Sequence, residues 1–250
     1  MKHVKHTQFK FPQAGGIYPE SQRSFIVLGP SGVGKTSAMI SLLTGPMKGL
    51  HTRIWIVSPS AKQGTDPLWD SYREWIKKHT DWADEETIFD HYDEETLTDL
   101  VETHGKVNAA LKKAGRKKLH SACLLLDDLA DSPEFHNNRN LIAKICLKGR
   151  HMGVSCCCLS QRYRALSTVV RPQACYLLVS HMRNRKELDA ILDELSGVYP
   201  RKILEQFYEE ATAEKQSFLY INLLADRRED MCYKNFEYRL MPQAVPLILT

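Results

Sequence analysis

The sequence lacks an apolar run long enough to cross a membrane as a helix. Its strongest apolar runs, residues 123–126 and 154–159, have the length of strands, whereas a membrane-spanning helix needs about 18 or more apolar residues. Residues 1–7 carry positive charge, but no apolar segment follows them, so the pattern of a secretory signal is missing. We therefore expect a protein that has no membrane span and is not secreted.

The sequence also lacks the cysteine pattern of a disulfide framework or a metal site. Its 7 cysteines are odd in number, none forms a CxxC pair, and three are adjacent at residues 156–158 within an apolar run. This setting is typical of small buried side chains in a reduced protein. The cysteines therefore predict an intracellular location.

No internal repeat and no low-complexity linker divides the 250 residues. With 43% hydrophobic and 26% charged residues, the composition excludes disordered and fibrous classes. The formal net charge of +4 permits contact with nucleic acid without requiring it. We expect one domain over residues 23–250, preceded by a polar extension over residues 1–22 that lies outside the core.

Apolar runs of strand length alternate with helix-patterned segments, which indicates an α/β fold with a mostly parallel sheet. Strands are expected at residues 25–28, 54–57, 123–126, 154–159 and 175–179. Helices are expected around residues 38–43, 69–76, 94–114, 141–145 and 188–195. Residues 218–223 and 231–238, separated by a polar stretch, predict a closing antiparallel hairpin at the edge of the sheet.

The first strand is followed by a match to the phosphate-loop pattern GxxxxGK[ST]. Its glycines let backbone N–H groups turn toward phosphate oxygens, and the helix N-terminus behind them favours negative charge. Lys35 is expected on the β- and γ-phosphates of ATP, and Thr36 on a Mg²⁺ ion. The predicted nucleotide-binding residues are Gly29, Pro30, Ser31, Gly32, Val33, Gly34, Lys35, Thr36 and Ser37.

Two acids end the apolar strand at residues 123–126. We expect Asp127 to hold Mg²⁺ and Asp128 to act as the base that polarises the attacking water. An acid pair in a surface loop is the alternative interpretation. The NKxD tetrapeptide that reads guanine is absent, which argues against a GTPase. A phosphate-loop nucleotide kinase stays open as an alternative function.

Gln161 follows the strand at residues 154–159. Ligands of open parallel sheets bind outside the carboxyl ends of the strands, so Gln161 is a candidate sensor of the γ-phosphate. Arg150 precedes the same strand, whose length puts it about 20 Å from the phosphates of its own subunit. It forms either a structural ion pair or an arginine finger that reaches a neighbour's nucleotide.

Several of these segments carry a family resemblance. The block over residues 148–162, with Arg150, a glycine before the strand and Gln161 after it, is similar to the FtsK/HerA superfamily of DNA-pumping ATPases. With the phosphate loop, Ser58-Pro59 and the Leu-Leu-Leu-Asp-Asp strand, residues 22–180 more closely resemble the poxvirus-type genome-packaging ATPases. One departure is that Asp128 stands where many members of the superfamily have glutamate.

The resemblance implies a three-layer phosphate-loop NTPase fold and an ATP-driven motor that moves double-stranded DNA into a viral capsid. It implies ATP and Mg²⁺ as cofactors, and a homo-oligomeric ring of five or six subunits at a capsid or portal vertex. It also implies a location in the host cell's virus factory or with the virion. In that ring Arg150 is the finger in trans. A helicase or partition ATPase that does not package DNA would share every nucleotide-binding residue.

A basic cluster lies between the helix at residues 94–114 and the acid strand. Five cations in seven residues suit sequence-independent contact with a DNA backbone. A solvated surface stretch explains them equally well. The predicted DNA-binding residues of this basic cluster are Lys112, Lys113, Arg116, Lys117 and Lys118.

Overall fold

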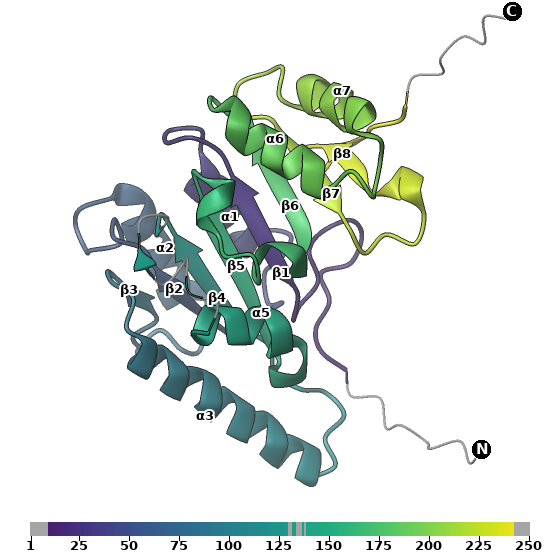
Figure 1. Ribbon diagram of the computed structural model, residues 1–250. Helices are drawn as coiled ribbons and strands as arrows, with labels where there is room; N and C mark the ends of the chain where they lie inside the picture. Colours follow the sequence, from purple (N-terminus) through teal and green to yellow (C-terminus); the bar gives the residue numbers. More distant parts are fainter. Residues whose placement is uncertain (1–9, 130–131, 134–136, 138, 243–250) are drawn as a thin grey trace, which may run out of the picture.

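The computed structural model describes residues 10–129, 132–133, 137 and 139–242 (Figure 1). Within these residues, nine strands form one sheet in the order β3-β2-β4-β5-β1-β6-β7-β8-β9. The six strands from β3 to β6 run parallel, and β7, β8 and β9 are antiparallel. The strands are β1 Ser24–Leu28, β2 Arg53–Val57, β3 Ile88–Phe89, β4 Ala122–Asp127, β5 Val154–Ser160, β6 Ala174–Ser180, β7 Phe218–Asn222, β8 Cys232–Lys234 and β9 Tyr238–Arg239.

Helices cover both faces of this sheet. They are α1 Lys35–Thr44, α2 Pro67–His79, α3 Glu94–Lys113, α5 Leu141–Met152, α6 Arg185–Glu194 and α7 Arg201–Ala211, with short 3₁₀ helices η1 Tyr163–Ala165, η2 Arg171–Gln173 and η3 Arg228–Asp230. Alternate residues of β1 divide between two cores. Phe25 belongs to the core that includes residues of α1 and α2, and Ile26 to the core that includes residues of α3, α5, α6 and α7. The expected three-layer sandwich with a mostly parallel sheet is confirmed.

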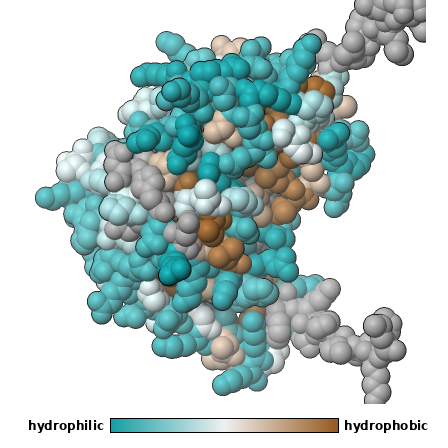
Figure 2. Space-filling view, in the orientation of Figure 1, coloured by the Kyte–Doolittle hydropathy of each residue, from teal (hydrophilic) through white to brown (hydrophobic). Residues whose placement is uncertain are grey.

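Burial follows the apolar pattern of the sequence. Every residue of β4 and β5 is buried, as expected for strands covered on both faces. All seven cysteines are free, and five of them are buried. The face in Figure 2 is largely hydrophilic, with a few hydrophobic patches near its middle. Among the described residues, no helix is both long and apolar enough to cross a membrane.

Part of the N-terminal extension packs on the domain, whereas the sequence predicted an extension outside the core. Residues 1–9 lie outside the described residues, but residues 10–22 run against the domain. The backbone of Lys10 forms an isolated parallel β-bridge with that of Lys118. The backbone carbonyl of Ile17 accepts a hydrogen bond from the Tyr220 hydroxyl at 2.5 Å. Ile17 and Tyr18 pack on the core between the sheet and helices α1 and α2. Isolated apolar residues in a polar stretch give no periodicity, so the sequence pattern did not reveal this packing.

The C-terminal strands also differ from the expectation. The expected antiparallel hairpin is confirmed, since β7 pairs with β8. The second expected strand, residues 231–238, is instead two short strands, because Asn235 adopts a left-handed φ of 56° and turns the chain back. Asparagine tolerates that conformation better than most residues. The apolar pattern of the sequence did not predict strand β3 or helix α7.

Candidate nucleotide site

The phosphate loop lies between β1 and α1, at the carboxyl edge of the parallel strands. Gly32 and Gly34 have left-handed φ values of 80° and 89°, a conformation that glycine adopts without steric cost. A Cβ atom on Gly29 would lie 2.7 Å from Val33 Cγ2 and 3.0 Å from Ser180 Cβ. Glycine is therefore required where the loop leaves β1, and all the predicted loop residues from 29 to 37 lie at this helix N-terminus.

Lys35 begins α1 and folds back over the phosphate loop. Its Nζ donates a hydrogen bond to the carbonyl oxygen of Pro30 at 3.1 Å. Burial lowers the pKa of the ammonium, while the nearby Asp128 and Asp127 carboxylates raise it. A buried ammonium held at the loop is placed to bind phosphate oxygens.

Asp127 ends β4 directly across from α1. Its Oδ2 accepts hydrogen bonds from the Thr36 hydroxyl at 3.1 Å and from the Ser58 hydroxyl at 3.2 Å. Burial raises the pKa of the carboxyl, and the two hydroxyls lower it. The structure therefore brings together the two residues predicted to hold the metal, although they are 91 positions apart.

Ser58 is a further residue of this site, because its hydroxyl donates a hydrogen bond to Asp127. Its hydroxyl lies 3.1 Å from the hydroxyl of Ser60, which accepts a hydrogen bond from Trp69 Nε1 at 3.1 Å. This chain of contacts fixes one side of Asp127. The sequence indicated only that Ser58 follows a strand, and the structure shows that this strand, β2, pairs with β4.

Asp128 and Gln161 meet above the ends of β4 and β5. The Gln161 amide Nε2 donates to Asp128 Oδ1 at 2.8 Å, and the adjacent register pairs Asp127 with Leu159. Asp128 is exposed, whereas Asp127 is 3% exposed. The two acids therefore have different surroundings, which agrees with different roles.

The residues present fit a magnesium ion. Mg²⁺ prefers hard oxygen ligands and keeps several waters, so it needs only one or two protein ligands beside substrate phosphates. The Thr36 hydroxyl and the Asp127 carboxylate supply such oxygens next to the phosphate loop. Within the described residues, no cluster of three or more His, Cys, Asp and Glu forms a metal cage.

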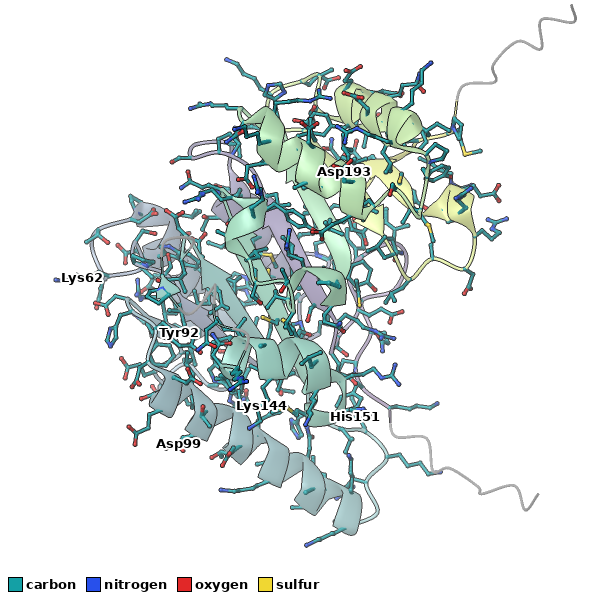
Figure 3. The ribbon with its side chains drawn as sticks, in the orientation of Figure 1. Lys62, Tyr92, Asp99, Lys144, His151 and Asp193 are labelled. Carbon is teal, nitrogen blue, oxygen red and sulfur yellow. The ribbon has the colours of Figure 1, made fainter. Side chains whose placement is uncertain are left out.

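Arg150 and the basic cluster lie at the amino ends of the parallel strands, opposite the phosphate loop. Arg150 is exposed in the last turn of α5, before β5 begins, and its neighbour His151 marks this place in Figure 3. Arg150, Arg23 and Lys112 line one hollow of about 310 Å³. All five predicted DNA-binding side chains are exposed at the end of α3 and in the connection to β4.

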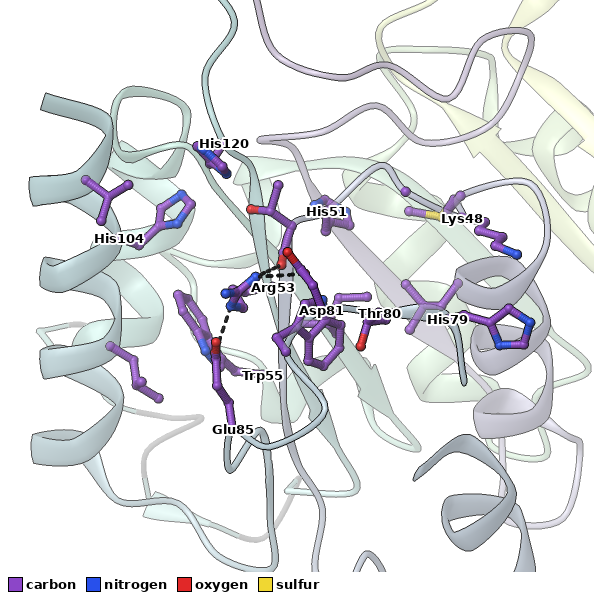
Figure 4. Close-up of a pocket in the computed structure, with 18 of the residues that line it drawn as sticks. Lys48, His51, Arg53, Trp55, His79, Thr80, Asp81, Glu85, His104 and His120 are labelled. Atoms are coloured by element: carbon purple, nitrogen blue, oxygen red, sulfur yellow. Dashed lines mark hydrogen bonds and ion pairs between the residues drawn. The ribbon is translucent and has the colours of Figure 1, made fainter. Parts of the chain in front are cut away.

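A different hollow of about 830 Å³ opens beside the first residues of β2. Figure 4 shows Arg53 crossing it, with Arg53 Nε 2.7 Å from Glu85 Oε2. His51, Trp55 and Trp82 line it and are almost fully buried. It contains no residue of the phosphate loop, so it is not the nucleotide site.

The glycine-rich loop after β1, the acids after β4 and the amide after β5 define the class of the protein as a phosphate-loop NTPase. The family model described as Poxvirus A32 protein matches residues 19–245. The chain belongs to this family, and the resemblance to the poxvirus-type packaging ATPases is confirmed. No protein of curated function matches the sequence significantly.

Solved structures share the fold. B204, the DNA-packaging ATPase from Sulfolobus Turreted Icosahedral Virus, matches with a TM-score of 0.54 and 16% identity over 87% of this chain and 98% of its own. The genome packaging NTPase B204 from Sulfolobus turreted icosahedral virus 2, in complex with ATP-gammaS, gives 0.55 and 16% over 88% and 98%. The pCW3 conjugation coupling protein TcpA with ATPgS gives 0.56 and 14% over 86% and 61%.

Proposed function

We propose that this protein is an ATPase motor that translocates double-stranded DNA into a viral capsid. The observation that carries the proposal is the meeting of Thr36 with Asp127, and of Gln161 with Asp128, beside a complete phosphate loop. The family match supports a viral packaging role. The structural relatives support it further, since one is described as a DNA-packaging ATPase and another was solved with ATP-gammaS.

The residues divide the work of hydrolysis. The phosphate-loop amides and Lys35 bind the β- and γ-phosphates. Thr36 and Asp127 would hold Mg²⁺, which would neutralise charge on the phosphates. Asp128 accepts a proton from the attacking water. Gln161 orients Asp128 and contacts the γ-phosphate, which couples the ends of β4 and β5 to the state of the nucleotide.

The motor works as a ring of five or six subunits at a capsid or portal vertex, in the virus factory or with the virion. The seven residues of β5 span about 20 Å at 3.3 Å each, which keeps Arg150 away from the nucleotide of its own subunit. In the ring, Arg150 serves the nucleotide of the adjacent subunit. The basic cluster faces DNA phosphates, which explains its exposed charges. The basic cluster lies at the amino ends of the strands and the phosphate loop at their carboxyl ends, so DNA and ATP bind at separate places.

ATPase assays with and without double-stranded DNA, together with native mass measurement, test the proposal. We expect a ring whose turnover rises with DNA and is abolished by Lys35→Ala. Lys78→Ala, which removes an exposed lysine on α2, is the matched control and should keep wild-type turnover. Phosphoryl transfer to a small acceptor by a monomer or dimer, without any effect of DNA, would identify a nucleotide kinase instead. DNA unwinding without capsid filling would identify a helicase.

A further inference from the structure

A hollow of about 860 Å³ lies beside the phosphate loop, on the side away from Asp127 and Asp128. Three segments distant in sequence line it. Pro30, Gly32 and Val33 come from the phosphate loop. Ser180 ends β6, and His181 and Arg183 follow it. The rest come from the end of α7 and the turn before β7. The last group includes Tyr208, Lys215 and Gln216.

The order of the strands gives the nucleotide a direction. The acids stand at the end of β4, and β5 and β1 separate that strand from β6. Neighbouring strands lie about 4.8 Å apart, so β4 and β6 are about 14 Å apart. An extended nucleoside triphosphate is comparable in length. With its γ-phosphate at Asp127 and its β-phosphate on the loop, its base would lie near the end of β6.

His181 offers a flat surface at that place. Its ring is exposed and stacks on Tyr208, with centroids 6.5 Å apart and planes 20° apart. Tyr208 is 5% exposed, and its hydroxyl accepts a hydrogen bond from the Met182 backbone N–H at 2.6 Å. The imidazole is therefore supported from behind by a buried, anchored ring.

We propose that His181 is the stacking platform for the nucleobase of ATP, in the hollow between the phosphate loop, the end of β6 and the turn before β7. The inference rests on the proposed function, since it assigns the base end of the same nucleotide. Every base has a π-face, and stacking on an aromatic ring holds it in a fixed position. Arg183 and Lys215 line the same hollow together with Glu209 and Glu214, of which Glu214 pairs with Lys234. Neither cation makes an ion pair among the described residues, and in this proposal they lie beside the ribose and the α-phosphate.

Calorimetric titration with two probes tests the proposal. Mg²⁺ with AMPPNP carries the base, whereas Mg²⁺ with inorganic tripolyphosphate occupies only the phosphate loop. His181→Ala should weaken AMPPNP binding by about five- to a hundredfold, the usual effect of losing one stacked base. Binding of tripolyphosphate should stay within about twofold of the wild type. His181→Phe, which keeps a flat ring, should restore AMPPNP binding.

The matched control is His79→Ala. His79 is also exposed and also stacks on an aromatic ring, Trp75, with centroids 4.9 Å apart, but it lines the hollow beside β2. The variant His79→Ala should bind both AMPPNP and tripolyphosphate like the wild type. Equal weakening of both probes by His181→Ala, or unchanged AMPPNP binding, would overturn the stacking role while leaving the phosphate site intact. A wild type that binds neither probe would overturn the nucleotide site itself.

Discussion

Gln161 Nε2 lies 2.8 Å from Asp128 Oδ1, so the amide that follows β5 holds the carboxylate that follows β4. Asp128 has a left-handed φ of 53°. Aspartate and asparagine occupy that region more readily than other residues with a Cβ atom. The backbone conformation thus favours aspartate at this position, and the bond from Gln161 orients its short side chain.

The two acids should separate binding from hydrolysis. Asp127→Ala should weaken binding of Mg²⁺-ATP, because it removes the buried oxygen that meets Thr36. Asp128→Asn should bind Mg²⁺-ATP normally but lose about 10²–10⁴-fold in kcat, the usual contribution of a general base. Titration calorimetry and steady-state ATPase assays measure the two effects. Identical behaviour of the variants would show that the division of roles is wrong.

Gln161→Ala should lower kcat more than it weakens ATP binding. Hydrogen bonds to charged groups contribute about 1.5–3 kcal/mol, so the loss in turnover should be about 10- to 150-fold. Gln206→Ala removes an exposed amide on α7 and should have no effect. Wild-type turnover in Gln161→Ala would rule out a role for the contact with Asp128 in hydrolysis.

Arg150 should act on the nucleotide of a neighbouring subunit. Arg150→Ala should bind ATP normally and hydrolyse it poorly, and Lys35→Ala should not hydrolyse it at all. Rings mixed from the two variants contain interfaces where an intact phosphate loop faces an intact Arg150, so mixing should restore part of the ATPase activity. Full activity of Arg150→Ala alone, or loss of its folding in a thermal melt, would assign Arg150 to a structural ion pair.

The basic cluster should give DNA binding that depends on salt but not on sequence. Removing one cation that neutralises a DNA phosphate should flatten the slope of log K against log salt by about 0.9. Replacing Lys113 and Arg116 by glutamine should therefore lower the slope by about 1.8 if both bind phosphates. Replacing the exposed Lys186 and Lys202 by glutamine leaves the basic cluster intact and serves as the control. An unchanged slope for the variant of Lys113 and Arg116 would show that the basic cluster is a solvated surface stretch that does not bind DNA.

His51 should make the fold sensitive to acid. Burial, with a smaller effect of His104, lowers the pKa of His51 to about 3, whereas an unfolded histidine has a pKa of about 6.5. Below that pH the unfolded chain binds a proton that the folded chain does not, so stability is complete above pH 6.5 and falls toward pH 3, by up to about 1.4 kcal/mol per pH unit.

The variant His51→Gln removes this titration. The imidazole Nδ1 lies 3.0 Å from the Ser121 hydroxyl, a contact that an amide can replace. Urea unfolding between pH 7 and pH 5 should show a flatter pH dependence for His51→Gln than for the wild type, and the exposed His79→Gln should keep the wild-type slope. Parallel pH profiles for all three proteins would contradict the effect.

Local patterns in the sequence determined most of the architecture. Apolar runs predicted the buried strands of the parallel sheet, because such strands are covered on both faces. The sequence predicted the phosphate loop directly, since its glycines and Lys35 lie within eight consecutive residues. The strand ends also predicted Asp127, Asp128 and Gln161 as site residues, because parallel strands end at the same edge of the sheet.

Only the tertiary structure decided which distant side chains meet. Ser58 reaches Asp127 because β2 lies beside β4, and His181 stacks on Tyr208 although α6 lies between them in sequence. The polar N-terminal stretch is held on the core by single contacts such as Tyr220 to Ile17. Such contacts depend on packing between segments far apart in the chain, and neither periodicity nor local spacing encodes that packing.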